Sequence, residues 1–367
     1  GTTAQVARAE GAGEGRVARA LGAQALWLSL GIGLALAAAV VALAEPVVAA
    51  LGATGQTGEY AVTYLRIASL GLPFALIAVG VQGYLRGVAD LRTPLVYVGA
   101  GNAANAVLSY LFVYPLGWGI AGSAWATVVA QTGMGAAFVV KVLLDARGAR
   151  AVRGALLRRL LAVGRHIFVR TSALYASFVV ATAVVARFGD AALGAHNIAF
   201  QLWIFLALVL DAVAIAGQVI VGRTLGAGDA EGAYAASVRM ILMSALVGAV
   251  FAAAMLALAP VLPRAFTGDE AVVEQALLLW PIFVLMQPLN GIVFALDGIL
   301  IGAGDVRYLM WSMLASGLAS IAAALTALAL DLGVAGVWGA LLVLILVRLA
   351  TLGPRFRRRR WLVTGWT

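Results

Sequence analysis

Long apolar segments alternate with short polar or glycine-rich segments along the whole chain. Each apolar segment is long enough for a helix to cross the hydrocarbon core of a membrane, which takes about 20 residues. The expected crossings are 20–52, 58–86, 92–114, 119–143, 163–187, 192–223, 232–262, 270–302, 306–330 and 334–353, with a short stub at 1–9 in front of them. The pattern therefore predicts an all-α integral membrane protein, because helices satisfy their backbone hydrogen bonds internally.

The second half of the chain repeats the first. Pro73 recurs as Pro288 and Asp90 as Asp305, each 215 positions later. The same offset relates Arg8, Gly11, Ala12, Gly13, Glu14, Gly83, Leu85, Gly87 and Arg92 to Arg223, Gly226, Ala227, Gly228, Asp229, Gly298, Leu300, Gly302 and Arg307. Internal duplication of hydrophobic helices is typical of secondary transporters, which place a central site between two similar bundles.

The one long break in hydrophobicity falls between the two copies. It divides the chain into an incomplete N-terminal lobe at 1–143, a cytoplasmic linker at 144–162, a C-terminal lobe at 163–353 and a basic cytoplasmic tail at 354–367. By comparison with the second copy, we expect about 53 residues to be missing in front of the first. We therefore expect two pseudosymmetric six-helix bundles, the first lacking its first helix and most of its second.

Composition and charge support a membrane protein. Hydrophobic residues make up 63% of the chain and charged residues 11%, with a mean hydropathy of +1.01. The net charge of +9 does not indicate nucleic-acid binding, because the arginines gather on one side of the predicted membrane. The positive-inside rule places the N-terminal side and the C-terminus in the cytoplasm. We expect a multi-pass protein of the plasma or inner membrane that contacts lipids and works as a monomer.

Signatures of enzymes are missing from the sequence. There is no Walker motif, and the one lysine, Lys141, lies in an apolar stretch. His166 and His196 are far apart, and there is no cysteine to hold a metal or form a disulfide. The sequence predicts neither an enzyme nor a cofactor beyond a coupling ion.

Two carboxylates, Asp211 and Asp297, lie plainly inside apolar helices. Burying such a group costs about 2.5–3.5 kcal/mol on insertion scales, so each needs a cavity, a proton or a partner. Helical spacing adds further candidates for a polar cavity, namely Gln218, Gln287, Asn290 and Phe294, with Gln82 as the repeat counterpart of Asp297 and Tyr175 as an aromatic wall. Hydration of Asp297 at the interface and core packing of Tyr175 remain alternatives.

The first lobe carries two polar stripes on consecutive helices. Asn102, Asn105 and Ser109 form one, and Ser123, Thr127 and Gln131 form the other. Their oxygens suit a hard cation or a proton relay if a carboxylate is near. On spacing alone, hydrogen bonding between helices is the favoured alternative.

Several motifs resemble the multidrug and toxic compound extrusion (MATE) family. They are residues 11–14 and their second copy, 83–94, 117–127 and 298–305. The stretch Leu296-Asp297-Gly298 resembles its DinF-like branch. The resemblance covers essentially the whole chain, and it implies two six-helix lobes that export organic compounds in exchange for H⁺ or Na⁺.

The resemblance also implies a cation site in the first lobe. Its amide and hydroxyl ligands fall on Asn105 and Thr127, whereas an expected carboxylate is replaced by Ser109. Asp211 and Asp297 match acidic positions of the second lobe. Because Arg170 is the one candidate cation beside these two carboxylates, we expect cationic cargo. The alternative is a lipid or lipid-linked oligosaccharide flippase of the same superfamily, which would carry a more basic cavity.

Overall fold

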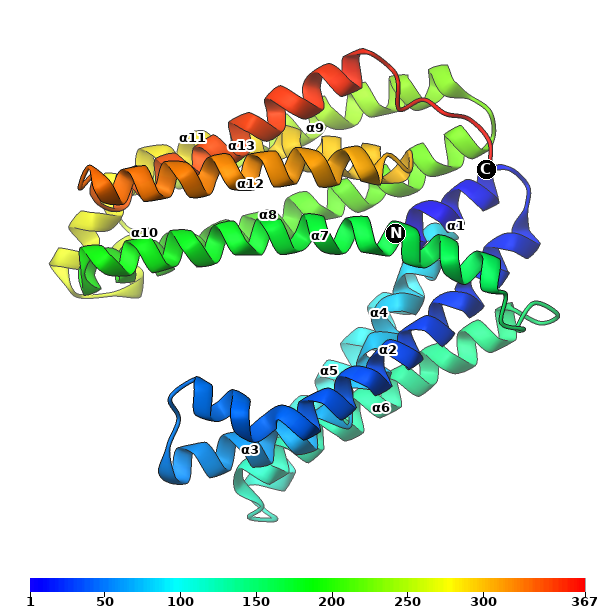
Figure 1. Cartoon of the computed structure of the whole chain (residues 1–367), viewed down its shortest axis with the longest axis horizontal. Helices are drawn as coiled ribbons and strands as arrows, with labels where there is room; N and C mark the ends of the chain where they lie inside the picture. The colour runs from blue at the N-terminus through cyan, green and yellow to red at the C-terminus, as the bar shows by residue number, and fades with distance from the viewer. Residues whose placement is uncertain (367) are drawn as a thin grey trace. The chain divides into compact units, whose positions relative to one another are not determined.

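The computed structural model describes residues 1–366, and its regular structure there is entirely helical (Figure 1). It divides into two compact units, the first formed by Thr2–Leu161 and the second beginning at Ala162. The first unit contains α1 (Thr2–Gly11), α2 (Gly15–Ala50), α3 (Gly55–Ser69), α4 (Leu72–Gly87), α5 (Arg92–Val113) and α6 (Gly119–Asp145). The second contains most of α7 (Gly154–Val185), then α8 (Asp190–Gly226), α9 (Ala230–Ala257), α10 (Leu262–Phe266), α11 (Glu270–Gly302), α12 (Val306–Ala329) and α13 (Gly333–Arg357).

The predicted membrane crossings are confirmed by helix length and apolarity. Within residues 1–366, nine helices are long and apolar enough to span a membrane, and α3 with α4 makes a tenth as a bent pair. The all-α membrane fold expected from the sequence is therefore correct.

The predicted crossing at 58–86 is divided between two helices. α3 and α4 meet at a bend of 51°. Pro73 lies in the first turn of α4 and has no N–H to donate to the carbonyl of Ser69, which ends α3. Its repeat counterpart, Pro288, lies inside the continuous helix α11.

Two other boundaries differ from the sequence-based expectation. α7 begins at Gly154, inside the stretch expected to be linker, because the Leu-Leu-Arg-Arg-Leu-Leu pattern that follows Ala155 continues the helical period. The segment between α6 and α7 is held against α2 by Gln24. Its side chain donates to Ala151 O and accepts from Arg153 N, both at 2.9 Å. α13 likewise continues to Arg357, into the predicted tail.

The internal repeat extends to backbone packing. A Cβ added to Gly33 would lie 2.5 Å from Pro73 Cα, and one added to Gly248 would lie 2.7 Å from Pro288 Cα. Each residue of the second contact follows its counterpart by 215 positions. The contacts of Gly87 with Thr3 O and of Gly302 with Gln218 O obey the same offset. The two units therefore share their helix-to-helix contacts as well as their motifs.

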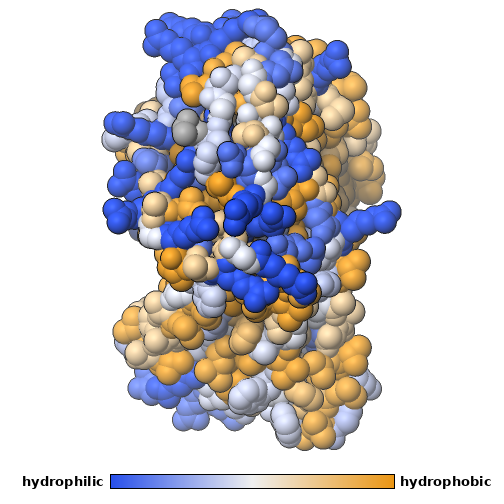
Figure 2. All heavy atoms as spheres, turned by 90° about the vertical axis from the view of Figure 1, so that its right-hand side faces the viewer, coloured by the Kyte–Doolittle hydropathy of each residue, from blue (hydrophilic) through white to orange (hydrophobic). Residues whose placement is uncertain are grey.

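The C-terminal tail folds against the second unit. Phe356 stacks on Tyr234 at 5.2 Å and on Trp361 at 5.4 Å between ring centroids. Arg359 lies 3.9 Å from the Tyr234 ring centroid, and Gly365 N donates to Leu225 O at 2.9 Å. Figure 2 faces the end at which the C-terminus lies, and hydrophilic side chains cover much of it.

The core of the second unit forms around α11, which packs against α8, α9 and α13. Trp338, Phe283 and Leu279 are fully buried there. Because α11 contributes buried residues along nearly its whole length, it holds the polar side chains near its C-terminal end in a rigid frame.

Candidate functional site

An open cavity of about 930 Å³ lies in the second unit, lined by α7, α8, α11 and α13. One end is polar and contains Arg170, Asp211, Gln218, Asp297 and Arg348. The other end is apolar, with the rings of Tyr175, Phe178, Phe200 and Trp203. This separation follows from the helix directions. The aromatic residues precede the polar ones on α8, whereas Arg170 precedes the aromatic residues on the antiparallel α7.

Three charged side chains meet at the polar end, and we call Arg170, Asp297 and Arg348 the Asp297 cluster. Both guanidinium groups donate to the same carboxylate oxygen, Oδ2 of Asp297. The side chains of Arg170, Asp297 and Arg348 are 14%, 9% and 5% exposed. Two guanidiniums and one carboxylate give the cluster a net charge of +1.

Polar atoms of the cluster retain hydrogen-bonding capacity. Oδ1 of Asp297 and Nε of Arg170 are buried, and neither has a hydrogen-bond partner among the described residues. Buried polar atoms are normally paired, and unpaired ones are frequent at binding sites. The cluster is therefore a candidate binding site as well as a structural ion pair.

Glycine brings the two acidic helices together. A Cβ added to Gly298 would lie 2.2 Å from Ala214 O, so only glycine allows α8 and α11 to approach this closely. Asp297 is adjacent to Gly298, and Asp211 lies about one turn from Ala214. The crossing therefore places both carboxylates on neighbouring turns of the cavity wall.

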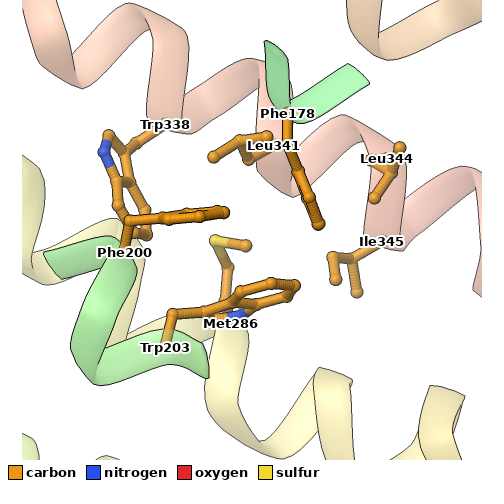
Figure 3. A pocket seen from close by; sticks show the side chains of 8 residues that line it. All are labelled: Phe178, Phe200, Trp203, Met286, Trp338, Leu341, Leu344 and Ile345. Carbon is orange, nitrogen blue, oxygen red and sulfur yellow. The ribbon is translucent and has the colours of Figure 1, made fainter. Parts of the chain in front are cut away.

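The aromatic end continues into a small recess of about 10 Å³ (Figure 3). Its lining consists of Phe178, Phe200, Trp203, Met286, Trp338, Leu341, Leu344 and Ile345. Phe178 packs edge-on against Phe200 at 5.3 Å and against Trp203 at 5.1 Å, and these three rings also line the large cavity. The apolar end is therefore a rigid aromatic wall, because interlocked rings have few alternative rotamers.

Most second-lobe site residues predicted from the sequence lie at this cavity. Asp211, Asp297, Tyr175, Gln218 and Phe294 line it. Gln287 and Asn290 lie elsewhere, in the packed interior of α11, where each is 1% exposed. The side chain of Gln287 donates to Phe283 O at 2.8 Å, within its own helix.

The predicted first-lobe residues make local hydrogen bonds. Ser109 Oγ donates to Asn105 Oδ1 at 2.9 Å, and Thr127 Oγ1 donates to Ser123 O at 3.0 Å. Gln82 Oε1 accepts from Arg86 at 3.3 Å. Among residues 1–366 no group of three or more His, Asp or Glu residues is placed to hold a metal ion. The coupling role of Asn105, Ser109 and Thr127 stays a prediction.

Sequence reasoning missed Arg348, and this corrects the expectation that Arg170 is the one cavity cation. A signal was present, because Arg348 is the one charged residue in the apolar stretch 333–354 of α13. Its spacing from Trp338, Leu341 and Ile345 also places it on the buried face of that helix.

Comparisons with known proteins agree with this architecture. The MatE family model matches residues 1–111 and 167–326. The chain is 31% identical over 291 residues to the chloroplastic protein DETOXIFICATION 44 of Arabidopsis thaliana, covering 78% of this chain and 55% of that protein. It is 28% identical over 379 aligned positions to DNA damage-inducible protein F of Escherichia coli, covering 100% of this chain and 80% of that protein.

A crystal structure of a MATE protein in complex with MaL6 has the same fold, with a TM-score of 0.86 at 19% identity. That likeness covers 98% of this chain and 83% of the other. The chain spans little more than half the length of plant relatives such as DETOXIFICATION 44. The resemblance of its motifs, including those of the DinF-like branch, is confirmed by the family model and by the relatives. The chain belongs to the MatE family, and it is a multi-pass membrane protein.

Proposed function

We propose that this chain is a secondary active antiporter that exports organic compounds across the cell membrane in exchange for H⁺ or Na⁺. Members of its family are transporters rather than enzymes, and relatives include multidrug and toxin extrusion protein 1 of Oryctolagus cuniculus. The positive-inside rule favours a cytoplasmic C-terminus, since Arg355 and Arg357–Arg360 follow the last span.

The observation that carries the proposal is the Asp297 cluster in a cavity of about 930 Å³. That volume is within the range of pockets for drug-sized ligands, about 300–1,000 Å³. Buried charges in membrane-spanning segments are expensive and mark ion or substrate pathways. The cavity combines such charges with an aromatic wall that fits the apolar body of an organic compound.

Coupling follows from the charge of this cavity. When a cation binds a carboxylate of Asp297 or Asp211, the net charge of the cavity rises by one unit. A cationic substrate then binds more weakly, and by reciprocity the bound substrate weakens binding of the cation. Release of one ligand therefore favours entry of the other. In the first unit, Asn105, Ser109 and Thr127 supply neutral oxygens that suit a second position for the cation.

A lipid flippase is a second candidate, because Arg348 gives the cavity the additional basic group that this function needs. Anionic phosphate groups of lipids or lipid-linked sugars pair well with two guanidiniums. The two candidates differ in their cargo and in their dependence on an ion gradient.

Proteoliposomes test both candidates. The full chain is reconstituted and given an inward H⁺ or Na⁺ gradient, and the loss of trapped cationic, neutral and anionic fluorescent compounds is measured. We expect gradient-dependent export of at least one compound with one of the two ions. If no compound is exported while a fluorescent lipid is moved between leaflets, the antiporter proposal is overturned in favour of the flippase.

A further inference from the structure

The last helix ends in a cluster of arginines at the edge of the membrane. As a helix, the apolar stretch 333–354 of α13 rises about 33 Å, close to the thickness of the hydrocarbon core of about 30 Å. Arg355 and Arg357–Arg360 follow this stretch directly. These arginines therefore lie at the depth of the lipid headgroups.

Only part of this positive charge is neutralised within the protein. Arg355 pairs with Asp305 at 2.6 Å, and Arg359 pairs with Glu231 at 2.8 Å. The other three, which we call the tail arginines, are Arg357, Arg358 and Arg360. All three are exposed, and no Asp or Glu among residues 1–366 forms an ion pair with them. Three neighbouring charges of one sign attract anions from the surroundings.

The tail arginines are presented by a fixed segment of chain. The backbone turns at Arg359, which has a φ of 54°. Beyond the turn, Trp361 is 1% exposed, and its indole N–H donates to Phe356 O at 3.0 Å. Further along, Gly365 N donates to Leu225 O at 2.9 Å. Because the segment is already ordered, a ligand that binds there loses little free energy to ordering the chain.

The position of the tail arginines determines which anion they meet. Guanidinium groups pair well with phosphate oxygens, because their planar forks donate two hydrogen bonds at once. At the depth of the headgroups, the phosphate present at high local concentration belongs to phospholipids. Val363 is 55% exposed beside the arginines, and an apolar side chain next to basic ones is typical of a surface that lies in the membrane interface. Both observations favour a lipid over a soluble anion.

We propose that the tail arginines form a binding site for the headgroups of anionic phospholipids. Their guanidinium groups pair with the lipid phosphate, and the stack of Trp361 on Phe356 holds them in place. None of the three lines the cavity, so this site goes beyond the proposed function and does not depend on the cargo or the coupling ion. A bound lipid also fixes the end of α13, the helix that carries Arg348 in the cavity wall.

Lipid titration of the full chain tests the proposal. The purified protein in dodecyl maltoside micelles is given phosphatidylglycerol or phosphatidylcholine with the same acyl chains, and the thermal midpoint is measured. A ligand that binds only the folded protein raises this midpoint as its concentration rises. We expect phosphatidylglycerol to raise the midpoint and phosphatidylcholine to leave it unchanged. Equal shifts with both lipids overturn the proposal, and so does an equal shift with inorganic phosphate at the same concentration.

Two triple variants with the same change in charge locate the site. The first replaces the tail arginines by glutamine. The second is Arg147→Gln/Arg153→Gln/Arg158→Gln, which removes three exposed arginines of the first unit that also have no acidic partner among residues 1–366. We expect the first variant to bind phosphatidylglycerol about tenfold more weakly, and the second to keep the wild-type affinity. Equal losses in both variants show attraction by total charge alone and overturn the proposal.

Proteolysis of the wild type gives a readout that needs no variant. The full chain is placed in nanodiscs of phosphatidylcholine with or without phosphatidylglycerol, and the fragments released by trypsin are followed by mass spectrometry. Relative to cleavage after Arg147 and Arg153, cleavage at the tail arginines should be about tenfold slower with phosphatidylglycerol, because a bound headgroup covers them. This readout decides the outcome if the first triple variant does not fold. An unchanged ratio of the two cleavage rates overturns the proposal.

Discussion

Arg348 of α13 and Asp297 of α11 form an ion pair between positions 51 residues apart in sequence. Both side chains are almost fully buried, and both line the cavity of the second unit. The pair therefore ties two helices together at the point where the cavity is most polar. Its contributions to stability and to binding can be measured separately.

Removing the carboxylate should destabilise the second unit. Asp297→Leu leaves two buried guanidiniums without their shared partner, and we expect the free energy of unfolding to fall by about 3–5 kcal/mol. Arg348→Met should also destabilise. Because the two residues interact, the double variant should lose less than the sum of the single losses. Unfolding of purified protein in mixed micelles measures the three values, and strict additivity would contradict a direct interaction.

The close crossing of α8 and α11 depends on Gly298. Gly298→Ala places a methyl group against the backbone at Ala214 and forces the helices apart, which should cost about 1–3 kcal/mol. Gly339→Ala is the control, because a Cβ there meets no atom within 4 Å. In thermal unfolding, the first variant should melt lower than the wild type and the second should not. Equal midpoints for both variants would show that the close approach is not needed.

The aromatic stack should hold the tail in place. Trp361→Ala removes a ring that stacks on Phe356 and a hydrogen bond from its indole N–H to Phe356 O. Ring pairs of this kind contribute about 0.5–1.5 kcal/mol beyond burial, so trypsin should cut at Arg357–Arg360 about tenfold faster. Val363→Ala changes a side chain that is 55% exposed and should leave the cleavage rate unchanged. Identical cleavage rates for both variants would show that the stack does not hold the tail in place.

The connection between α4 and α5 should respond to pH through Asp90. Partial burial raises the pKa of Asp90, but the hydrogen bonds from the Thr93 hydroxyl and N–H outweigh burial, and the pKa lies below its usual value. A carboxyl group with a lowered pKa stabilises the folded state above its unfolded pKa of about 4, and this stabilisation is lost as the pH falls through the folded value.

We therefore expect Asp90→Ala to lower stability by about 1 kcal/mol at neutral pH, because the hydrogen bonds from Thr93 are lost. The difference from the wild type should shrink as the pH falls below about 4, where Asp90 becomes protonated. Thermal midpoints of both proteins across this pH range measure the difference in stability. A difference that is the same at all pH values would show that the charge of Asp90 does not contribute.

The sequence was sufficient to predict the spans and the repeat, because both follow from hydrophobic periodicity and from scarce residues such as Pro73 and Asp90. It also indicated Asp297 as a site residue, since a carboxylate in an apolar helix needs a cavity, a proton or a partner. These inferences rest on local patterns, which a single sequence records directly.

The pairing within the cluster could not be predicted in this way. Arg170, Asp297 and Arg348 lie on three helices, and their meeting depends on how those helices cross. Gln287 and Asn290 show the opposite case. They share a helical stripe with Asp297, but close packing around α11 encloses them, so they do not reach the cavity.

The most direct test of the account is gradient-driven export by Asp297→Asn. Asp305→Asn is the matched control, because Asp305 also pairs with an arginine of α13 but does not line the cavity. Initial rates are measured in proteoliposomes with equal amounts of inserted protein. We predict that the wild type and Asp305→Asn export substrate and that Asp297→Asn falls to the background rate. Export by Asp297→Asn at the wild-type rate would contradict a role for this cavity in transport.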